Sequence, residues 1–325
     1  MNLRSAVYEL SAKYKLDAKA SAQLRTLAGL DIEPPMLLPQ LARGVAMLAA
    51  ALGGFGLILW IAANWDDFGR AGRFTLLEGV VVTTSLAAIL RPAARAPFAL
   101  LALLAIGALL AYFGQTYQTG ADLWQLFALW SALALPLCMS TRSDALWTPW
   151  ALVSMTAISL WMHAHTGHGW RVRPNDIDVD VLTCAATVAL SLALSPLGAR
   201  YTGAGPWALR TSVSLTCCQI SLMALLALFS SDVGSLYWIG LIVLVAMMAT
   251  LARGRLHDIF GVSVAGLALN GLAVAGLGHA LLDRTGGDHI GAWLLLGLAA
   301  AAMLAVTVHL ILNSARQSES TRSLA

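Results

Sequence analysis

Long runs of apolar residues, separated by short polar segments, fill the chain from about Leu41 to Asn313. Each run has about 17–25 residues, the length that an α-helix needs to cross the hydrocarbon core of a bilayer. Lipid offers no hydrogen-bond partner to the backbone, so each crossing has to be a helix. The pattern therefore predicts an all-α, polytopic transmembrane helix bundle of about ten spans, placed near 41–63, 74–90, 97–113, 122–139, 145–162, 180–197, 207–229, 233–252, 259–282 and 290–313.

The positions of Lys and Arg predict the orientation of these spans, because cytoplasmic loops retain basic residues. With the N-terminus inside, the outer segments hold only five of the 20 basic residues: Arg70, Arg73, Arg171, Arg173 and Arg284. The opposite orientation would reverse this ratio. We therefore expect an N-in and C-in topology. A re-entrant second or third span would move every later loop to the other side.

The segment before the first span has a different pattern. Asp17 is suited to N-cap a second short helix, and Gly29 is suited to end it. This predicts a cytoplasmic helical hairpin and linker over residues 1–35, followed by the bundle over 36–315 and a polar tail over 316–325. The first helix of the hairpin has one apolar stripe at helical spacing, formed by Leu3, Val7, Leu10 and Tyr14. The stripe fits a docking element for a protein partner or the bilayer surface, or a cap that packs on the protein's own inner loops.

Composition narrows the function classes. Charged residues make up 11% of the chain, against about 25% in an ordinary soluble domain. The net charge of +3 and the lack of a basic, aromatic-laced patch argue against a nucleic-acid partner. No CxxC pair occurs, so the four cysteines are interpreted as buried small apolar residues: Cys138, Cys184, Cys217 and Cys218.

No enzyme chemistry can be recognised, since a Ser–His–Asp order, a phosphate-binding glycine loop and an HExxH motif are all missing from the sequence. His163, His165 and His168 form a tract that three later aspartates could complete as a metal site, but an exposed tract is favoured. The sequence predicts neither a metal nor a cofactor, and it indicates no oligomeric state. The aspartates are Asp176, Asp178 and Asp180.

Two polar clusters follow spans that lie close together in the sequence, and both are predicted to emerge on the outer face. They supply directional hydrogen-bonding groups beside flat aromatic side chains, as expected of a shallow site for a polar solute, a peptide or a lipid headgroup. The candidate ligand-binding residues are Asn64, Trp65, Asp66, Glu78, Gln115, Tyr117, Gln118 and Asp122.

A structural interpretation of the same residues stays open. Trp and Tyr gather at bilayer interfaces as anchors, and Asp122 is placed to N-cap the fourth span. Glu78 lies one turn inside the second span, where it fits a cation- or proton-coupling group or an interfacial glutamate. Deeper in the bundle, Gln219 and Asn270 fit a pathway or interhelical hydrogen bonds.

The two clusters also resemble a bacterial family of predicted inner-membrane proteins, catalogued as domain of unknown function 2157. The resemblance covers roughly residues 10–150, and a short helical segment before the first span is similar to the region from Tyr14 to Leu30. It implies a bacterial inner-membrane location and carries no activity. The motifs are Ala62-Ala63-Asn64-Trp65-Asp66, the run from Phe113 to Asp122, and Leu126-Phe127-Ala128-Leu129-Trp130.

Three functions remain in competition. A transporter-like or solute-binding protein would use the outer polar and aromatic site. A non-catalytic assembly, envelope or signalling component would use the hairpin to dock a partner. An intramembrane enzyme acting on lipid would need an acid–base pair that the sequence does not display. The concentration of polar residues at one outer corner favours the first.

Overall fold

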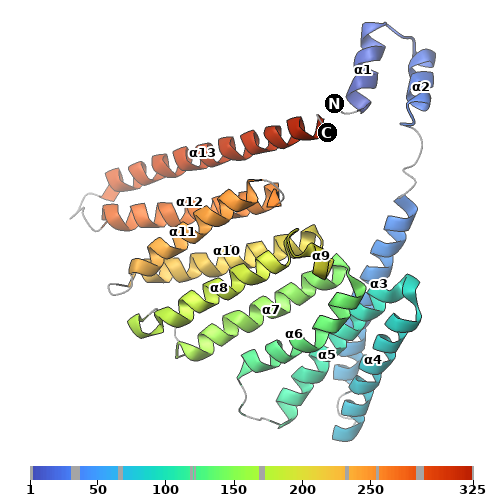
Figure 1. The fold of residues 1–325 in the computed structure, drawn as a ribbon, viewed down its shortest axis with the longest axis vertical. Coiled ribbons are helices and arrows are strands. Elements are labelled where there is room, and N and C mark those ends of the chain that lie inside the picture. The colour runs from blue at the N-terminus through green and yellow to red at the C-terminus, as the bar shows by residue number, and fades with distance from the viewer. Residues whose placement is uncertain are drawn as a thin grey trace. The chain divides into compact units, whose positions relative to one another are not determined.

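A computed structural model describes residues 3–30, 37–64, 69–117, 120, 122–167, 173–230, 234–253, 256–282 and 289–323. Every regular element in these ranges is a helix. The chain divides into two compact units, Met1–Ala49 and Ala50–Ala325. Figure 1 labels the helices of both units.

The first unit holds a helical hairpin, α1 (Leu3–Lys13) and α2 (Ala18–Leu27), and the beginning of α3 (Leu37–Ala63). Asp17 caps α2 as predicted, because its Oδ1 accepts a hydrogen bond of 2.7 Å from the backbone N–H of Ala20. Gly29 follows the helix with a φ of +68°, a conformation that glycine adopts without strain. Ser11 and Ser21 join the two helices by a hydrogen bond of 3.0 Å between their hydroxyls.

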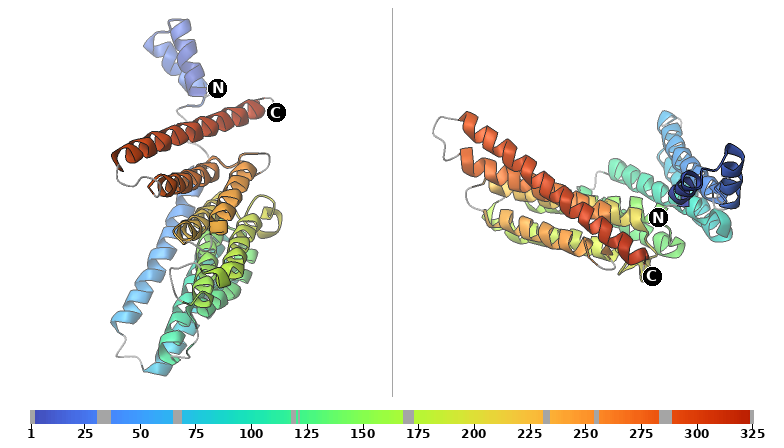
Figure 2. Two further views of the ribbon diagram at one scale, coloured as in Figure 1. Left: turned by 90° about the vertical axis from the view of Figure 1, so that its left-hand side faces the viewer. Right: turned by 90° about the horizontal axis from the view of Figure 1, so that it is seen from above.

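The second unit contains the remaining helices, which are α4 (Arg70–Leu90), α5 (Arg95–Tyr117), α6 (Leu123–Thr141), α7 (Asp144–His165), α8 (Ile177–Ala193), α9 (Ala199–Thr202), α10 (Pro206–Leu228), α11 (Gly234–Leu251), α12 (Ile259–Leu282) and α13 (His289–Ser323). Two 3₁₀ turns, Pro92–Ala94 and Pro174–Asp176, precede α5 and α8. Helix α10 is central, because it packs against α7, α8, α11 and α12. Figure 2 shows α13 lying along α12 at the edge of this group.

Nine helices in the described ranges are long and apolar enough to cross a membrane. They match nine of the ten predicted spans within a few residues, including the short second and third. The remaining prediction, 180–197, corresponds to α8, which has only 17 residues. Helix α13 continues to Ser323, through most of the segment that the sequence suggested would be a polar tail.

Contacts between helix ends show that α8 nevertheless traverses the bundle. The N-termini of α7 and α10 lie together, because the carboxylate of Asp144 accepts hydrogen bonds from the backbone N–H groups of Gly205, Trp207 and Ala208. Two helices that begin at the same end run parallel, so the chain between them must return to that end. Helix α8 packs on both α7 and α10 and is the long element that makes this return. Within the described residues, α8 therefore runs antiparallel to α7 and α10.

Candidate functional site

An aromatic cluster with one cation lies where α4 begins and α5 ends. The ring of Tyr117 is 5.8 Å from that of Phe74 and 4.8 Å from that of Phe113, centroid to centroid. The guanidinium of Arg70 lies 5.6 Å from the Tyr117 centroid, within the range of a cation–π interaction. Tyr117 remains half exposed. Beneath this cluster Tyr112 is buried against Phe74, so α4 and α5 are held together at this end.

The structure separates two residues that the sequence placed in one outer loop. Helix α5 extends through Gly114 and ends only at Tyr117, so Gln115 and Tyr117 both lie on a helix. Residues that are two positions apart on a helix, such as Gln115 and Tyr117, differ by about 200° around its axis. Tyr117 therefore faces α4, whereas Gln115 lies beside α6. The prediction that residues 114–122 form a loop was wrong for its first four members.

Gln115 lines a cavity of about 410 Å³ between α5 and α6. Gln115 is the only residue of the lining, among the described residues, whose side chain bears an amide, hydroxyl or charge. The indole of Trp130 also borders the cavity. The lining residues are Gly107, Leu110, Ala111, Gly114, Gln115, Gly120, Leu123, Leu126, Phe127 and Trp130.

The position of Trp130 depends on a glycine. Its indole Nε1 donates a hydrogen bond of 2.8 Å to the backbone carbonyl of Leu103, one turn before Gly107 on α5. A Cβ at Gly107 would overlap the Trp130 ring, so only glycine allows the indole to approach α5 this closely. With its N–H already bonded, Trp130 contributes an apolar wall, and Gln115 provides the hydrogen-bonding groups.

The other candidate residues lie outside this cavity's lining. Asn64 donates from Nδ2 to the carbonyl of Trp60 at 2.8 Å and so caps its own helix. Asp122 is the N-cap residue of α6, as predicted, but its side chain makes no capping hydrogen bond. Glu78 is exposed on α4, and the guanidinium of Arg70 lies over the ring of Tyr117. Trp65, Asp66 and Gln118 fall outside the described residues.

The structure contains a second polar feature, along α8, that the sequence analysis did not identify. One face of α8, continued into the turn after it, carries a row of polar side chains that are buried among the neighbouring helices. On α10, Ser212 and Thr216 are fully buried. Thr216 bonds both to Ser191, hydroxyl to hydroxyl at 3.0 Å, and to the carbonyl of Thr187 at 3.2 Å. We call the following set the α8 polar row: Asp180, Thr183, Thr187, Ser191 and Ser195.

The signal for this row is present in the sequence. Its members follow one another at intervals of three or four residues, which places them on one face of a helix. The row was missed because Asp180 was grouped with Asp176 and Asp178 as a possible metal site, while the hydroxyl residues hardly interrupt the apolar run. An amphipathic pattern inside a predicted span marks a face turned toward protein, since lipid would leave such groups without partners.

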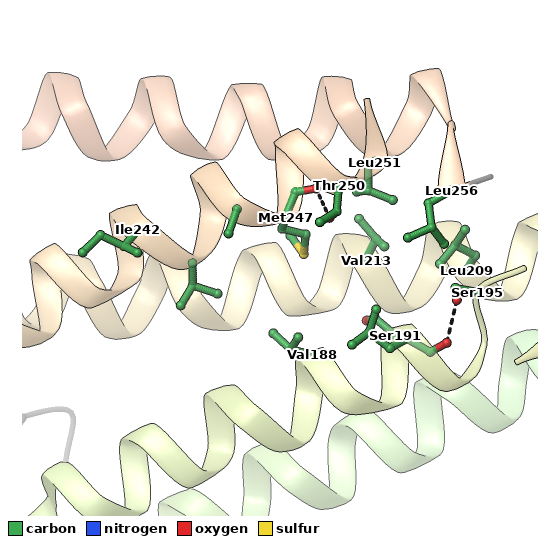
Figure 3. A pocket seen from close by; sticks show the side chains of 13 residues that line it. Val188, Ser191, Ser195, Leu209, Val213, Ile242, Met247, Thr250, Leu251 and Leu256 are labelled. Carbon is green, nitrogen blue, oxygen red and sulfur yellow. Dashed lines mark hydrogen bonds between the residues drawn. The ribbon is translucent and has the colours of Figure 1, made fainter. Parts of the chain in front are cut away.

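The far end of the row borders a second cavity, of about 250 Å³, between α8, α10 and α11. Figure 3 shows Ser191 on α8 and Ser195 in the turn after it, opposite Met247, Thr250 and Leu251. The hydroxyls are already bonded, for instance Ser195 to the carbonyl of Leu192 and Thr250 to that of Met247. The cavity therefore presents a largely apolar surface, with its serines at one edge.

The two deep amides make interhelical hydrogen bonds. Gln219 accepts from Ser159 of α7 at 2.9 Å, and Asn270 accepts from Thr307 of α13 at 3.2 Å. Three of the four cysteines are buried, as expected from the sequence, but Cys218 is exposed on α10. Adjacent helix positions differ by about 100°, so Cys217 and Cys218 cannot share one face.

The fold and these contacts define an α-helical membrane protein with many crossings. Residues 5–147 match the family described as Predicted membrane protein (DUF2157). The match confirms the resemblance carried by the two polar clusters, and it covers less than half of the chain. No curated protein and no solved structure matches this chain.

Proposed function

We propose that this protein is a transporter-like, solute-binding protein of the bacterial inner membrane, and that its outward-facing site is the cavity between α5 and α6. The observation that supports the proposal best is the cavity itself, about 410 Å³ in volume with Gln115 among otherwise apolar walls. Binding sites for small molecules have volumes of about 300–1,000 Å³ and combine apolar walls with a few placed polar groups.

The lining indicates the kind of solute. The Gln115 amide offers two N–H donors and a carbonyl acceptor. Trp130, Phe127 and the leucines around it offer apolar surface and no charge. A small, mostly apolar molecule with one neutral hydrogen-bonding group fits this surface better than an ion does. The half-exposed Tyr117, with Arg70 over its ring, lies on the opposite side of α5 and belongs to a separate surface.

The experiment fills the cavity and removes its polar group separately. Ala111→Phe places a ring inside the cavity, and Gln115→Ala deletes the amide. Val82→Phe on α4 is the control, because Val82 is 62% exposed and does not line the cavity. Each purified variant is extracted, and the small molecules that accompany it are compared by mass spectrometry.

We expect a compound that accompanies the wild type and Val82→Phe, is lost in Ala111→Phe and is reduced in Gln115→Ala. Identical extracts from all four proteins would contradict the proposal. Loss of phospholipid alone would also contradict it, since the cavity would then be a lipid-filled groove.

A second candidate function is favoured by the surface of the helical hairpin. Val7 of the predicted stripe is buried, yet Tyr8 and Tyr14 are 72% and 65% exposed and Leu27 is 87% exposed. Large exposed apolar groups of this kind are typical of contact surfaces. In this alternative the hairpin docks a cytoplasmic protein partner, and the protein is a non-catalytic membrane component. The test is whether each variant restores the phenotype of a strain from which the gene is deleted. Failure of the Tyr8→Ser, Tyr14→Ser double variant, with restoration by Ala111→Phe, would favour this alternative.

A further inference from the structure

Asp180 is a carboxylate buried inside the bundle with an oxygen that has no partner. The residue lies in the first turn of α8 and is only 3% exposed. Its Oδ2 atom is buried and makes no hydrogen bond in the described part of the structure. Burying an ionised carboxylate without a partner is strongly unfavourable, so such a group either binds a cation or takes up a proton.

The charges around Asp180 add to this cost. Asp176, one turn earlier and at the N-cap of α8, also has a buried Oδ2 without a hydrogen bond. Asp178 points to solvent. Of the helices packed on α8, α10 has a single charged residue, Arg210, at the opposite end. Two carboxylates four positions apart on one helix face repel each other when both are ionised.

The remaining neighbour is the last turn of α7, which carries His163 and His165. The ring of His165 stacks on Trp161 at 4.6 Å, and its Nδ1 atom lies 2.8 Å from the Trp161 carbonyl. His165 is therefore engaged with its own helix and with Trp124 of α6. Arg173, just before the 3₁₀ turn at Pro174–Asp176, is exposed. Within the described ranges, Asp180 forms no ion pair that would neutralise it.

From Asp180 the α8 polar row leads away into the bundle. Thr183 and Thr187 are each 1% exposed, and Ser191 is bonded to Thr216. The row then reaches the edge of the cavity between α8, α10 and α11, which Ser191 and Ser195 line. Hydroxyl groups can both donate and accept, so they are the side chains that can pass a hydrogen-bonded proton or water contact along a helix. An ionisable group inside a bundle is by default a candidate for a proton or ion pathway.

We infer that Asp180 is a proton-binding carboxylate, and that the α8 polar row connects it with the opposite side of the bundle. A hydronium ion at the end where α7 finishes gives its proton to Oδ2, which forms an O–H bond and leaves water. Release reverses the step and restores the carboxylate. A resident metal cation is disfavoured, because no group of three or more His, Cys, Asp and Glu is arranged to hold one in the described residues. Proton binding at Asp180 does not depend on the proposed function. Only the role of the proton, which is to couple solute movement to proton movement, rests on it.

The test reads the protonation state of the side chain directly and needs no solute. Infrared spectra of the full-length protein in lipid nanodiscs are recorded while the pH is raised from acidic to neutral. A protonated carboxyl group has a C=O stretch that disappears when the group ionises. Asp180→Asn removes the candidate and retains its shape. Asp178→Asn is the matched control, since Asp178 lies in the same turn and is exposed.

We expect the wild type and Asp178→Asn to keep one protonated-carboxyl band after the exposed carboxylates have ionised, and Asp180→Asn to lack it. Asp176→Asn should keep the band but lose it at a lower pH than the wild type, because the repulsion from Asp176 is removed. If the band is missing from the wild type, persists in Asp180→Asn, or is lost in Asp176→Asn alone, the inference is wrong. Because Ala111→Phe should leave the band intact, a lost solute with a retained band counts against the proposed function only. A retained solute without the band counts against the proton site only.

Discussion

The carboxylate of Asp144 accepts a hydrogen bond of 2.8 Å from the backbone N–H of Ala208, so the first residue of α7 caps the first turn of α10. The first N–H groups of a helix have no partner within it, and the positive end of the helix dipole favours an anion there. Asp144 satisfies the N–H groups of Gly205 and Trp207 as well. One side chain thus joins two helices that are separated in the sequence by the whole of α8.

Replacing Asp144 should weaken the packing of α10 on α7. Asp144→Ala leaves three N–H groups without this acceptor, and we expect a loss of about 1–3 kcal/mol in the free energy of unfolding. Asp144→Asn keeps one acceptor oxygen and should lose less. The measurement is reversible unfolding of the purified protein in mixed micelles. Equal stability of the wild type and Asp144→Ala would show that the cap contributes nothing.

Gly107 and Trp130 give a second stability prediction. Gly107→Ala adds a methyl group where the indole lies and should cost about 1–3 kcal/mol, the usual range for overpacking. Trp130→Phe removes the hydrogen bond to Leu103 and should cost about 1 kcal/mol from the bond alone, with additional loss from the smaller ring. Gly79→Ala on α4 is the control, because a Cβ added at Gly79 would meet no atom within 4 Å. If Gly79→Ala were as destabilising as Gly107→Ala, the close contact between Gly107 and the Trp130 indole would be refuted.

Arg210 of α10 and Asp258, at the start of α12, form an ion pair, with Nη2 2.9 Å and Nε 3.2 Å from Oδ1. Asp258 also caps α12 by accepting from the N–H of Gly261 at 2.9 Å. The Arg210 guanidinium lies 5.4 Å from the Trp207 ring centroid. Lysine cannot reproduce this geometry.

We therefore expect Arg210→Lys to destabilise the protein measurably, whereas Arg253→Lys at an exposed site should be neutral. A double-mutant cycle between Arg210 and Asp258 should give a coupling of about 1 kcal/mol that decreases with added salt, since the pair is partly exposed. A coupling of zero at low salt would mean that the two helices are held only by their apolar contacts.

Hydropathy located the helices well because membrane-spanning segments must be both apolar and long, and these two properties are visible in any sequence. The end of α5 was placed too early because Gly114 and the polar residues after it are typical of a loop. In the structure the helix continues to Tyr117, whose ring packs on Phe74 of α4 as well as on Phe113 of its own helix. Contacts with a distant helix are not encoded in local propensity.

The candidate site shows the same limit. The sequence placed Gln115 in a loop, whereas it lies in the last turn of α5. The cavity that it lines depends on Trp130 lying against Gly107, a pairing across 23 residues that no local pattern reveals. The α8 polar row was readable from spacing alone, given that residues 180–197 are predicted to form a helix. Which of its members would be buried depended on the positions of α7 and α10.

The crossing of α8 is the structural claim on which the topology depends most, because α8 is shorter than the other spans. If it crosses, residues before and after it lie on opposite faces of the membrane. Asp178→Cys and Arg200→Cys, both at exposed positions, test this with a membrane-impermeant thiol reagent on intact cells. The background carries Cys218→Ala, because Cys218 is the exposed native thiol. We expect labelling at 178 and none at 200 until the cells are opened. Labelling of both positions in intact cells would make α8 re-entrant, and it would place α10 and every later helix in the opposite orientation.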